Sequence, residues 1–421
     1  MKFGKGYGVL LMVLIAGCLL CGCAKRKSES ENRITENSKE AKNIKQEERE
    51  QWEKGYDLPL EEAEQEEATA ECKKMMEKIW SIYKLADKGE ASNVVLQDET
   101  ILEMQKAVAE TGYPVSVTVA YSDMENYEKA EQFLIDCEKG KSGSVIIYEV
   151  RQDGGIGRMK FSYDGTDMYV VSTSGVWVES DKPGIAYTSY TRIKEWKYTE
   201  NGWFCYELCV QEPPEVTEIM DGSQMIRIKP RTEEQREMSK LCVRGIGYQG
   251  NNLLCSDWNL EHLDALDYNG LYEYLYRMKF GERFPTEKYL KGIPKDEFES
   301  LIMEYFPISA ERLQEYAEFD EKTKRYAWAS LGCGNYAPNF FGTSVPEVVE
   351  VRENPDGTVT LTVNAVCDMV ICDDALITHD LTVKFKEDGS FQYLGNEIRK
   401  EDRNNVPEYQ YRVKGEIKND S

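Results

Sequence analysis

Acidic side chains gather in one short stretch near the end of the chain, at Asp368, Asp373 and Asp374. Carboxylate oxygens are the hard ligands that Ca²⁺ prefers, and a loop can bring several of them around one ion. The spacing is not that of an EF-hand, and no glycine stands where such a loop turns sharply. These three aspartates are therefore a weak candidate calcium site, and a loop of solvated carboxylates is the alternative.

Only two histidines, His262 and His379, are available as bases or metal ligands. They cannot complete a three-histidine zinc site, and the sequence contains no H-E-x-x-H motif. His379 has the same strand parity as Leu381 and Val383, so we expect a packed, hydrogen-bonded histidine. His262 could meet Cys333 only through the fold, and nothing near Cys333 in the sequence indicates an activated thiol.

The other motifs for catalysis or cofactor binding are weak or missing. Gly245, Gly247 and Gly250 match the dinucleotide pattern G-x-G-x-x-G, but a helix-like stretch precedes them where a strand is needed. We interpret these glycines as a turn. The sequence has neither a G-x-S-x-G nucleophile motif nor a P-loop. It therefore assigns no catalytic residue and no cofactor.

The strongest chemical signal lies at the beginning of the chain. Two lysines precede an uncharged apolar run, residues 8–20, which is too short to span a bilayer and has the form of an export signal. The run ends in Leu20-Cys21-Gly22-Cys23, which resembles the lipobox of bacterial lipoproteins, where a cysteine is acylated and becomes the first mature residue. The resemblance predicts a signal peptide over residues 1–22 and lipidation at Cys23.

Cys18 is the alternative acylation site, although cleavage there would leave two leucines on the mature chain. An export signal that is cleaved without lipidation is a further alternative. Acyl chains such as palmitate would hold the protein at the extracytoplasmic face of the cell membrane.

Charge and cysteine content restrict the partners and the compartment. The chain carries 76 acidic and 52 basic residues, a net charge of −24. This acidity argues against nucleic acid and against polybasic docking on anionic lipid. Beyond Cys23 there are nine cysteines, mostly within apolar patterns, and an odd number leaves at least one thiol free. We therefore expect buried thiols rather than a disulfide framework.

Composition and periodicity divide the remaining chain. Residues 23–60 contain few apolar side chains and are expected to form a disordered tether. Residues 61–230 and 231–400 each begin with helix-like stretches and continue with alternating strands joined by Asp-Gly or Asn-Gly turns. Residues 401–421 are expected to be a flexible, charged tail. The fold class is α+β, with two domains that each place N-terminal helices before an antiparallel β-meander.

Hydrophobic periodicity and capping residues place the individual elements. We expect the alternation after Pro114 to form a strand that extends to Tyr121, and Ser122 to start a helix. Thr100, Thr232 and Ser309 are further expected helix caps. The expected helices cover residues 61–88, 99–110, 271–280, 294–305 and 310–316, and the expected strands of the first meander cover 144–150, 157–163, 167–172, 186–198, 203–210 and 224–229.

Aromatic residues crowd two of these elements. Tyr272, Tyr274 and Tyr276 share one helix, and Trp177, Tyr187, Tyr190, Trp196 and Trp203 belong to the first meander. They could line a groove for a peptide or a sugar. Ordinary core packing and strand propensity explain them equally, so both interpretations stay open.

Four stretches, together with the lipobox, resemble an uncharacterised family of lipoproteins from Gram-positive, Clostridia-like gut bacteria, a domain of unknown function. They are Asp153-Gly-Gly-Ile-Gly-Arg-Met-Lys-Phe161, Tyr248-Gln-Gly-Asn-Asn-Leu-Leu-Cys255, Phe341-Gly-Thr-Ser-Val-Pro-Glu347 and Asp388-Gly-Ser-Phe-Gln-Tyr-Leu-Gly395. The resemblance covers most of the mature chain and implies a location and a common fold. It implies no activity and no catalytic residue.

These observations favour a membrane-anchored lipoprotein that binds or scaffolds an unknown protein, peptide or glycan and is not an enzyme. The first alternative is a cell-surface hydrolase acting on polysaccharide or peptide through acidic residues. The second is a carrier of lipid or another hydrophobic ligand, in which the first meander curls into a half-barrel. A cleft where acids and aromatics converge would support the hydrolase, and an apolar cavity would support the carrier.

Overall fold

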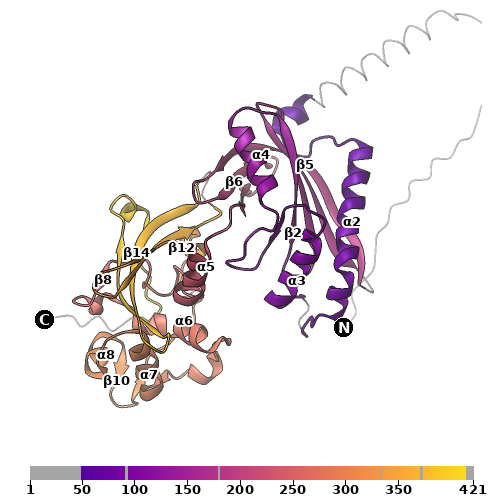
Figure 1. The fold of residues 1–421 in the computed structure, drawn as a ribbon. Helices are drawn as coiled ribbons and strands as arrows, with labels where there is room; N and C mark the ends of the chain where they lie inside the picture. The colour runs from indigo at the N-terminus through magenta and orange to yellow at the C-terminus, as the bar shows by residue number, and fades with distance from the viewer. Residues whose placement is uncertain (1–48, 91–92, 179–180, 333, 370–372, 414–421) are drawn as a thin grey trace, which may run out of the picture. The chain divides into compact units, whose positions relative to one another are not determined.

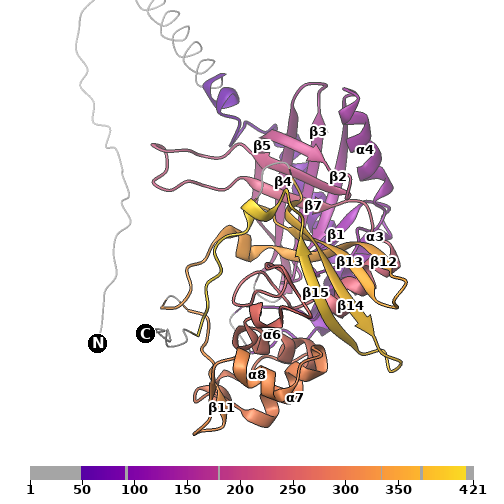
Figure 2. The same ribbon diagram turned by 90° about the vertical axis from the view of Figure 1, so that its left-hand side faces the viewer.

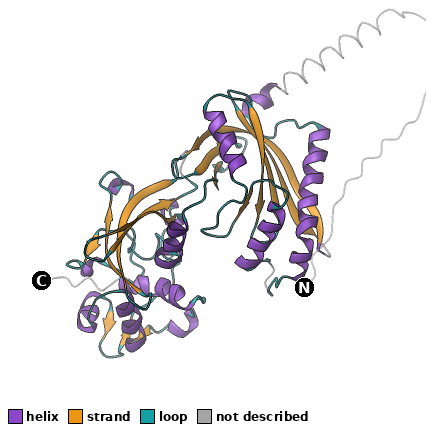
Figure 3. Ribbon diagram, in the orientation of Figure 1, coloured by secondary structure: helices purple, strands orange, loops and turns teal. Residues whose placement is uncertain are grey.

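The computed structural model is a mixed α+β protein with several sheets that are mainly antiparallel (Figures 1 and 3). Lys54–Ser421 forms one compact unit. The structure describes residues 49–90, 93–178, 181–332, 334–369 and 373–413. Within these ranges, no helix is long and apolar enough to cross a bilayer. The predicted signal peptide and both candidate acylation sites, Cys18 and Cys23, lie outside them.

The first sheet has seven strands in chain order, and every neighbouring pair is antiparallel except the parallel pair β1–β2. Gly154 and Gly202 turn between strands with positive φ, as their Asp-Gly and Asn-Gly dipeptides predict. The strands are β1 (Val115–Val117), β2 (Gly143–Val150), β3 (Ile156–Tyr163), β4 (Met168–Val178), β5 (Lys182–Tyr198), β6 (Trp203–Leu208) and β7 (Ser223–Arg227).

Helices cover both faces of this sheet (Figure 1). Ile147 and Tyr148 are neighbours on β2 and therefore point to opposite faces. Ile147 packs with Phe133 and Leu134 of α4 (Glu128–Glu138). Tyr148 belongs to the core formed with α2 (Glu62–Leu85) and α3 (Asp98–Ala109). Both faces of the sheet are thus covered by helices.

The second sheet has five strands in the order β12-β13-β14-β15-β8. Its apolar face, with Leu361, Val363 and Leu381, packs against the helices of this half, and α6, α7 and α8 are gathered together in Figure 2. Its other face carries Thr360, Thr362 and other polar residues. The strands are β8 (Trp258–Asn259), β12 (Val345–Glu353), β13 (Val359–Val366), β14 (Ala375–Phe385) and β15 (Phe391–Ile398); the helices are α5 (Glu233–Met238), a π-helical turn (Ser239–Val243), α6 (Tyr268–Phe280), α7 (Lys295–Tyr305) and α8 (Ala310–Tyr316).

A small third sheet, in the order β10-β11-β9, lies beside α7 in this half. Its strands are β9 (Ile293–Pro294), β10 (Phe319–Asp320) and β11 (Arg325–Tyr326).

Two predicted helix starts are confirmed and two are wrong. Thr232 forms a complete capping box with Gln235, and Ser309 accepts a hydrogen bond from the N–H of Arg312. Helix α3 instead begins at Asp98, ahead of Thr100. Ser122 does not start α4, which begins six residues later, after a turn in which Asn126 has positive φ.

The strand predicted to run to Tyr121 ends at Val117. Its ladder partner β2 ends at Val150, opposite Val117, so no strand is left for the chain to pair with. The backbone then turns away, and Tyr121 has a left-handed conformation with a φ of 59°. This turn directs the following side chains toward the second sheet.

Parts of the predicted tether and of the predicted tail form hydrogen bonds within the unit that begins at Lys54. Residues 49–54 are helical, and the N–H of Leu58 donates to the carbonyl of Tyr190 on β5, within the predicted tether. In the predicted tail, the Tyr409 hydroxyl donates to Asp267 at 2.6 Å. Arg412 is 3% exposed, and its Nη2 donates to the carbonyl of Gly250.

Candidate functional site

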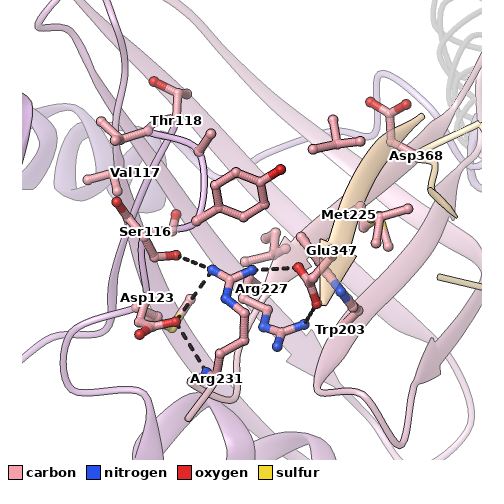
Figure 4. Close-up of a pocket in the computed structure, with 18 of the residues that line it drawn as sticks. Ser116, Val117, Thr118, Asp123, Trp203, Met225, Arg227, Arg231, Glu347 and Asp368 are labelled. Carbon is pink, nitrogen blue, oxygen red and sulfur yellow. Dashed lines mark hydrogen bonds and ion pairs between the residues drawn. The ribbon is translucent and has the colours of Figure 1, made fainter. Parts of the chain in front are cut away.

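A pocket of about 340 Å³ opens where the segment after β1, the strand β7 and the start of β12 meet (Figure 4). β1 and β7 are the two edges of the first sheet, so its curvature brings both edges to this one cavity. The pocket is lined by residues 116–124, Glu149, Trp203, Met225, Ile226, Arg227, Arg231, Thr343, Val345, Glu347, Val366 and Asp368.

Glu347 is held between two arginines (Figure 4). Arg227 Nη1 donates to its Oε1 at 2.7 Å, and Arg231 Nη1 donates to its Oε2. The side chains of Glu347, Arg231 and Arg227 are only 3%, 4% and 10% exposed. Charges buried this far from water persist only when they are paired. The three side chains therefore tie the first sheet to the second.

The strand register explains why Glu347 reaches this position. On β12, Glu347 pairs with Asn364, whereas the next residue, Val348, pairs with Val363 in the apolar core. Glu347 therefore points to the polar face of the second sheet. Arg227 at the end of β7 and Arg231 just beyond it cover that face here. Glu347 is therefore buried, although the alternation of strand residues places it on the face expected to meet solvent.

The turn after β1 completes this wall. Arg231 Nη2 donates to the carbonyl of Ser122 at 3.0 Å, and Asp123 accepts hydrogen bonds from Arg231 and Arg236. The hydroxyl of Tyr121 donates to the carbonyl of Pro346 at 2.7 Å. Burial raises the pKa of Tyr121 above its usual value, so the hydroxyl stays protonated and remains a donor. The left-handed turn is thus fixed to β12.

Several polar groups in the pocket lack a partner within the described ranges, among them the buried Nε1 of Trp203 and the buried Nε of Arg231. The carboxylates of Glu149 and Asp368 have no hydrogen-bond or ion-pair partner in the described part of the chain. The Nε of Arg227 is buried without a partner. Its Nη2 also has none among the described residues and, unlike Nε, is not buried. Since the orphan atoms come from different walls, a ligand could satisfy them together.

Desolvation acts on two of these groups in opposite directions. Burial raises the pKa of Glu149, an effect that Arg151 opposes and Asp153 reinforces. Burial lowers the pKa of Arg227, and Glu347 opposes this change. The guanidinium nevertheless remains charged at neutral pH. An oppositely charged ligand group in the pocket would stabilise the ionised carboxylate of Glu149, and another would stabilise the guanidinium of Arg227.

The three candidate calcium ligands take different positions. Asp368 lines the pocket, and Asp374 is buried and accepts a hydrogen bond from Asn201 at 3.1 Å. Asp373 accepts the N–H of Asp374. In the described ranges, no group of three or more His, Cys, Asp and Glu side chains is placed to hold a metal ion. Calcium binding here stays a prediction.

The prediction for His379 is confirmed. The ring is fully buried, with Nε2 2.9 Å from the Tyr248 hydroxyl and Nδ1 2.6 Å from Asn396 Oδ1. An amide oxygen only accepts, so Nδ1 carries the proton and Nε2 accepts from Tyr248. Burial lowers the pKa of His379 to about 4. His262 is exposed, and its suggested partner Cys333 lies outside the described residues.

Several cysteines have the free thiols that the sequence predicts, and most of them are buried. Burial raises the pKa of Cys72 and Cys137 to about 11 and that of Cys242 and Cys255 to about 12. Such thiols stay protonated at neutral pH and are poor nucleophiles. The free thiols among the described residues include Cys72, Cys137, Cys209, Cys242, Cys255 and Cys367.

The glycine motif and the aromatic residues are largely structural. Gly245 and Gly250 have positive φ in a turn after the π-helical turn, and no helix opens on Gly250. Tyr272 is buried in the second core, where it stacks on Phe298. Trp203 is the exception, because it lines the pocket with the guanidinium of Arg227 5.1 Å from its ring centre.

The sequence indicated only Asp368 among the pocket's charged residues. Glu149, Arg227, Arg231 and Glu347 are isolated charges within or beside strands, and such charges usually face solvent. The one available signal was the stretch 341–347, on which the family resemblance partly rested. It supplies Thr343, Val345 and Glu347 to the pocket.

A family model described as "Family of unknown function (DUF6070)" matches residues 65–412. The matched residues include every charged side chain of the pocket. No curated protein and no solved structure matches the chain.

Proposed function

Since the chain belongs to the DUF6070 family of unknown function, we propose a function from its own pocket: a lipid-anchored, extracytoplasmic protein that binds a small charged ligand. One observation carries the proposal. Glu149, Asp368 and Arg227 present uncompensated polar groups to one cavity, and unsatisfied groups of this kind cost stability unless a ligand pairs with them. At about 340 Å³, the cavity is at the small end of ligand pockets, which range from about 300 to 1,000 Å³.

Blocking the cavity tests this binding function. Val345 lies on the pocket wall and is 47% exposed, so Val345→Trp adds a large ring there without disturbing a core. Val178→Trp is the matched control, since Val178 is 48% exposed at the end of β4 and does not line the pocket. A panel of amino acids, amines, carboxylic acids and sugars is screened by thermal shift on the full chain. We expect at least one compound to raise the melting temperature of the wild type and of Val178→Trp, but not of Val345→Trp.

The outcome that contradicts pocket binding is equally clear. No compound would shift the wild type, or the same shifts would appear in Val345→Trp. In either case the cavity would not be a ligand site.

The anchor is proposed from the sequence of the leader. Acylation of Cys23, or of Cys18 in the alternative, would place the protein at the outer face of the cell membrane, because several acyl chains anchor almost permanently. Cys23→Ser should move the protein from the membrane fraction to the soluble or precursor fraction, whereas Cys18→Ser should not. Mass spectrometry of the wild type showing an unmodified leader would contradict the anchor.

A hydrolase is the second candidate function, because Glu149 and Asp368 are two unpaired carboxylates in the same pocket. Glycosidases work with carboxylate pairs, and burial raises the pKa of Glu149 as a general acid requires. Nitrophenyl glycosides and peptide substrates test it. Turnover that disappears in both Glu149→Gln and Asp368→Asn would favour the hydrolase over simple binding.

We also propose that the chain folds as two α+β domains, residues 61–230 and 231–400, each with helices before a meander. The supporting observation is that all seven strands of the first sheet lie before residue 228, and all five of the second lie after residue 257. Residues 54–230 and 231–413, produced as separate chains, should then each unfold in one cooperative transition. Failure of either piece to fold would argue against the division.

A further inference from the structure

The arrangement of charge in the pocket points to the chemistry of its ligand. We propose that the ligand is a zwitterion of the amino-acid class, with its ammonium group on Glu149 and its carboxylate on Arg227. This inference rests on the proposed ligand-binding function.

The cationic end of the ligand follows from Glu149. Its carboxylate lies on β2 beside Ser116, its register partner on β1, and it has no partner of its own among the described residues. A carboxylate accepts hydrogen bonds but cannot donate them, so its natural partner in a dry site is a charged N–H group. A ligand ammonium group would supply three such donors.

The anionic end of the ligand follows from the arginines. Arg227, Arg231 and Arg236 surround only two carboxylates, Glu347 and Asp123, which leaves one positive charge in excess. Arg227 donates only one hydrogen bond, and its Nη2 is accessible. A ligand carboxylate accepting from Nη2 would remove the excess charge. The stacked Trp203 keeps the guanidinium in place.

We assign both charged groups to one ligand because the protein residues that would bind them do not neutralise each other. Glu149 and Arg227 both line the pocket, yet they form no ion pair. They come from β2 and from the edge strand β7, with the apolar side chains of Val117, Met225 and Val345 also on the walls. A small molecule with opposite charges and an apolar portion would satisfy all three features.

The remaining acid limits the net charge of the ligand. Asp368 is unpaired among the described residues, and the lining residues taken together with Arg236 comprise four carboxylates and three arginines, a net charge of −1. A neutral or basic amino acid would suit this balance. A dicarboxylic amino acid would add a second negative charge beside Asp368 and should be rejected.

Charge-deleted analogues test the inference directly. L-Leucine, L-lysine, L-glutamate, L-leucinamide and N-acetyl-L-leucine are titrated into the full chain in detergent by calorimetry. We expect leucine or lysine to bind, with leucinamide and N-acetylleucine at least tenfold weaker than leucine and glutamate weakest. Leucinamide lacks the carboxylate and N-acetylleucine lacks the ammonium group, so each reports on one end.

Variants assign the ends to residues. Glu149→Gln should weaken leucine at least tenfold and leave N-acetylleucine unchanged, because the acetylated ligand has no ammonium group to lose. Glu261→Gln, an exposed change outside the pocket, should leave both affinities unchanged. The expected pattern would not arise if Glu149→Gln merely loosened the fold.

Each other result has a defined meaning. Equal binding of leucine and its two analogues, or a preference for glutamate, would overturn the zwitterion while leaving pocket binding intact. Binding of other panel compounds, sensitive to Val345→Trp, without any amino acid would do the same. If nothing binds and Val345→Trp behaves as wild type, both the inference and the proposed function are wrong.

Discussion

Two of the buried arginine–glutamate clusters in the described part of the chain differ in how completely their charges are matched. Between β3 and α2, Arg158 donates from Nε and Nη2 to Glu71 at 2.8 and 2.7 Å. Its side chain is 2% exposed, whereas that of Glu71 is 28% exposed. In the pocket wall, by contrast, Glu347 is shared between Arg227 and Arg231 and is itself almost fully buried.

The difference between these clusters shows what distinguishes a structural ion pair from a candidate site. Both contain buried guanidinium nitrogens without partners, so burial and imperfect satisfaction do not separate them. The cluster at Arg158 matches one cation with one anion. The cluster at Glu347 has unequal charges and lies beside a cavity that contains another unpaired carboxylate, Glu149. An unbalanced charge beside a cavity therefore distinguishes the candidate site from the structural ion pair.

The largest expected effect is at Glu347. Glu347→Gln would leave Arg227 and Arg231 facing each other without the anion between them, and breaking a buried pair costs about 3–5 kcal/mol. We expect the free energy of unfolding, measured by urea denaturation, to fall by that amount. A loss below about 1 kcal/mol would mean that the arginines find other partners and that the two clusters are alike.

A smaller loss is expected at the matched pair. Glu71→Gln keeps an oxygen that can accept from Arg158, and partial exposure of position 71 lets water screen the remaining charge. The unfolding free energy should fall by about 1–2 kcal/mol in the same assay. If this loss equals that of Glu347→Gln, the contrast in solvent exposure has no energetic consequence.

The smallest expected effect has the opposite sign. Burial raises the folded-state pKa of Glu149, so ionising this side chain opposes folding. The penalty is absent below the ordinary glutamate pKa and develops as the pH rises toward the raised value. Glu149→Gln should therefore stabilise the ligand-free protein by up to about 1 kcal/mol at neutral pH and by less at pH 4. A variant that is less stable than wild type at neutral pH would show that Glu149 is already compensated.

Much of the fold was predictable from local patterns. Alternation in Val359–Val366 and the Asp-Gly dipeptides predict the sheets, because strands with one buried face alternate apolar and polar residues and tight turns favour glycine. The segment after Val117 was not predictable. Its alternation continues to Tyr121, but the strand ends where β2 stops providing a partner, and that depends on tertiary pairing.

Most residues of the candidate site cannot be predicted from the sequence, for a related reason. Glu347 occupies a strand position that alternation assigns to water, and only the approach of Arg227 and Arg231 buries it. Arg227 lies 120 positions before Glu347 in the chain, and Arg231 lies 116 positions before it. This environment therefore arises only in the folded structure. Asp368 alone is predictable, because Asp373 and Asp374 lie close to it in the sequence.

The buried Arg412 also constrains when the second half of the molecule can finish folding. Its guanidinium bonds to the carbonyl of Gly250, 162 positions earlier, and to the carboxylate of Glu273. Until residue 412 has left the ribosome, and on the proposed export route the membrane channel, these acceptors lack their donor. The half built around α6 is therefore completed last, whereas the seven strands of the first sheet, which end at Arg227, can pair earlier in synthesis.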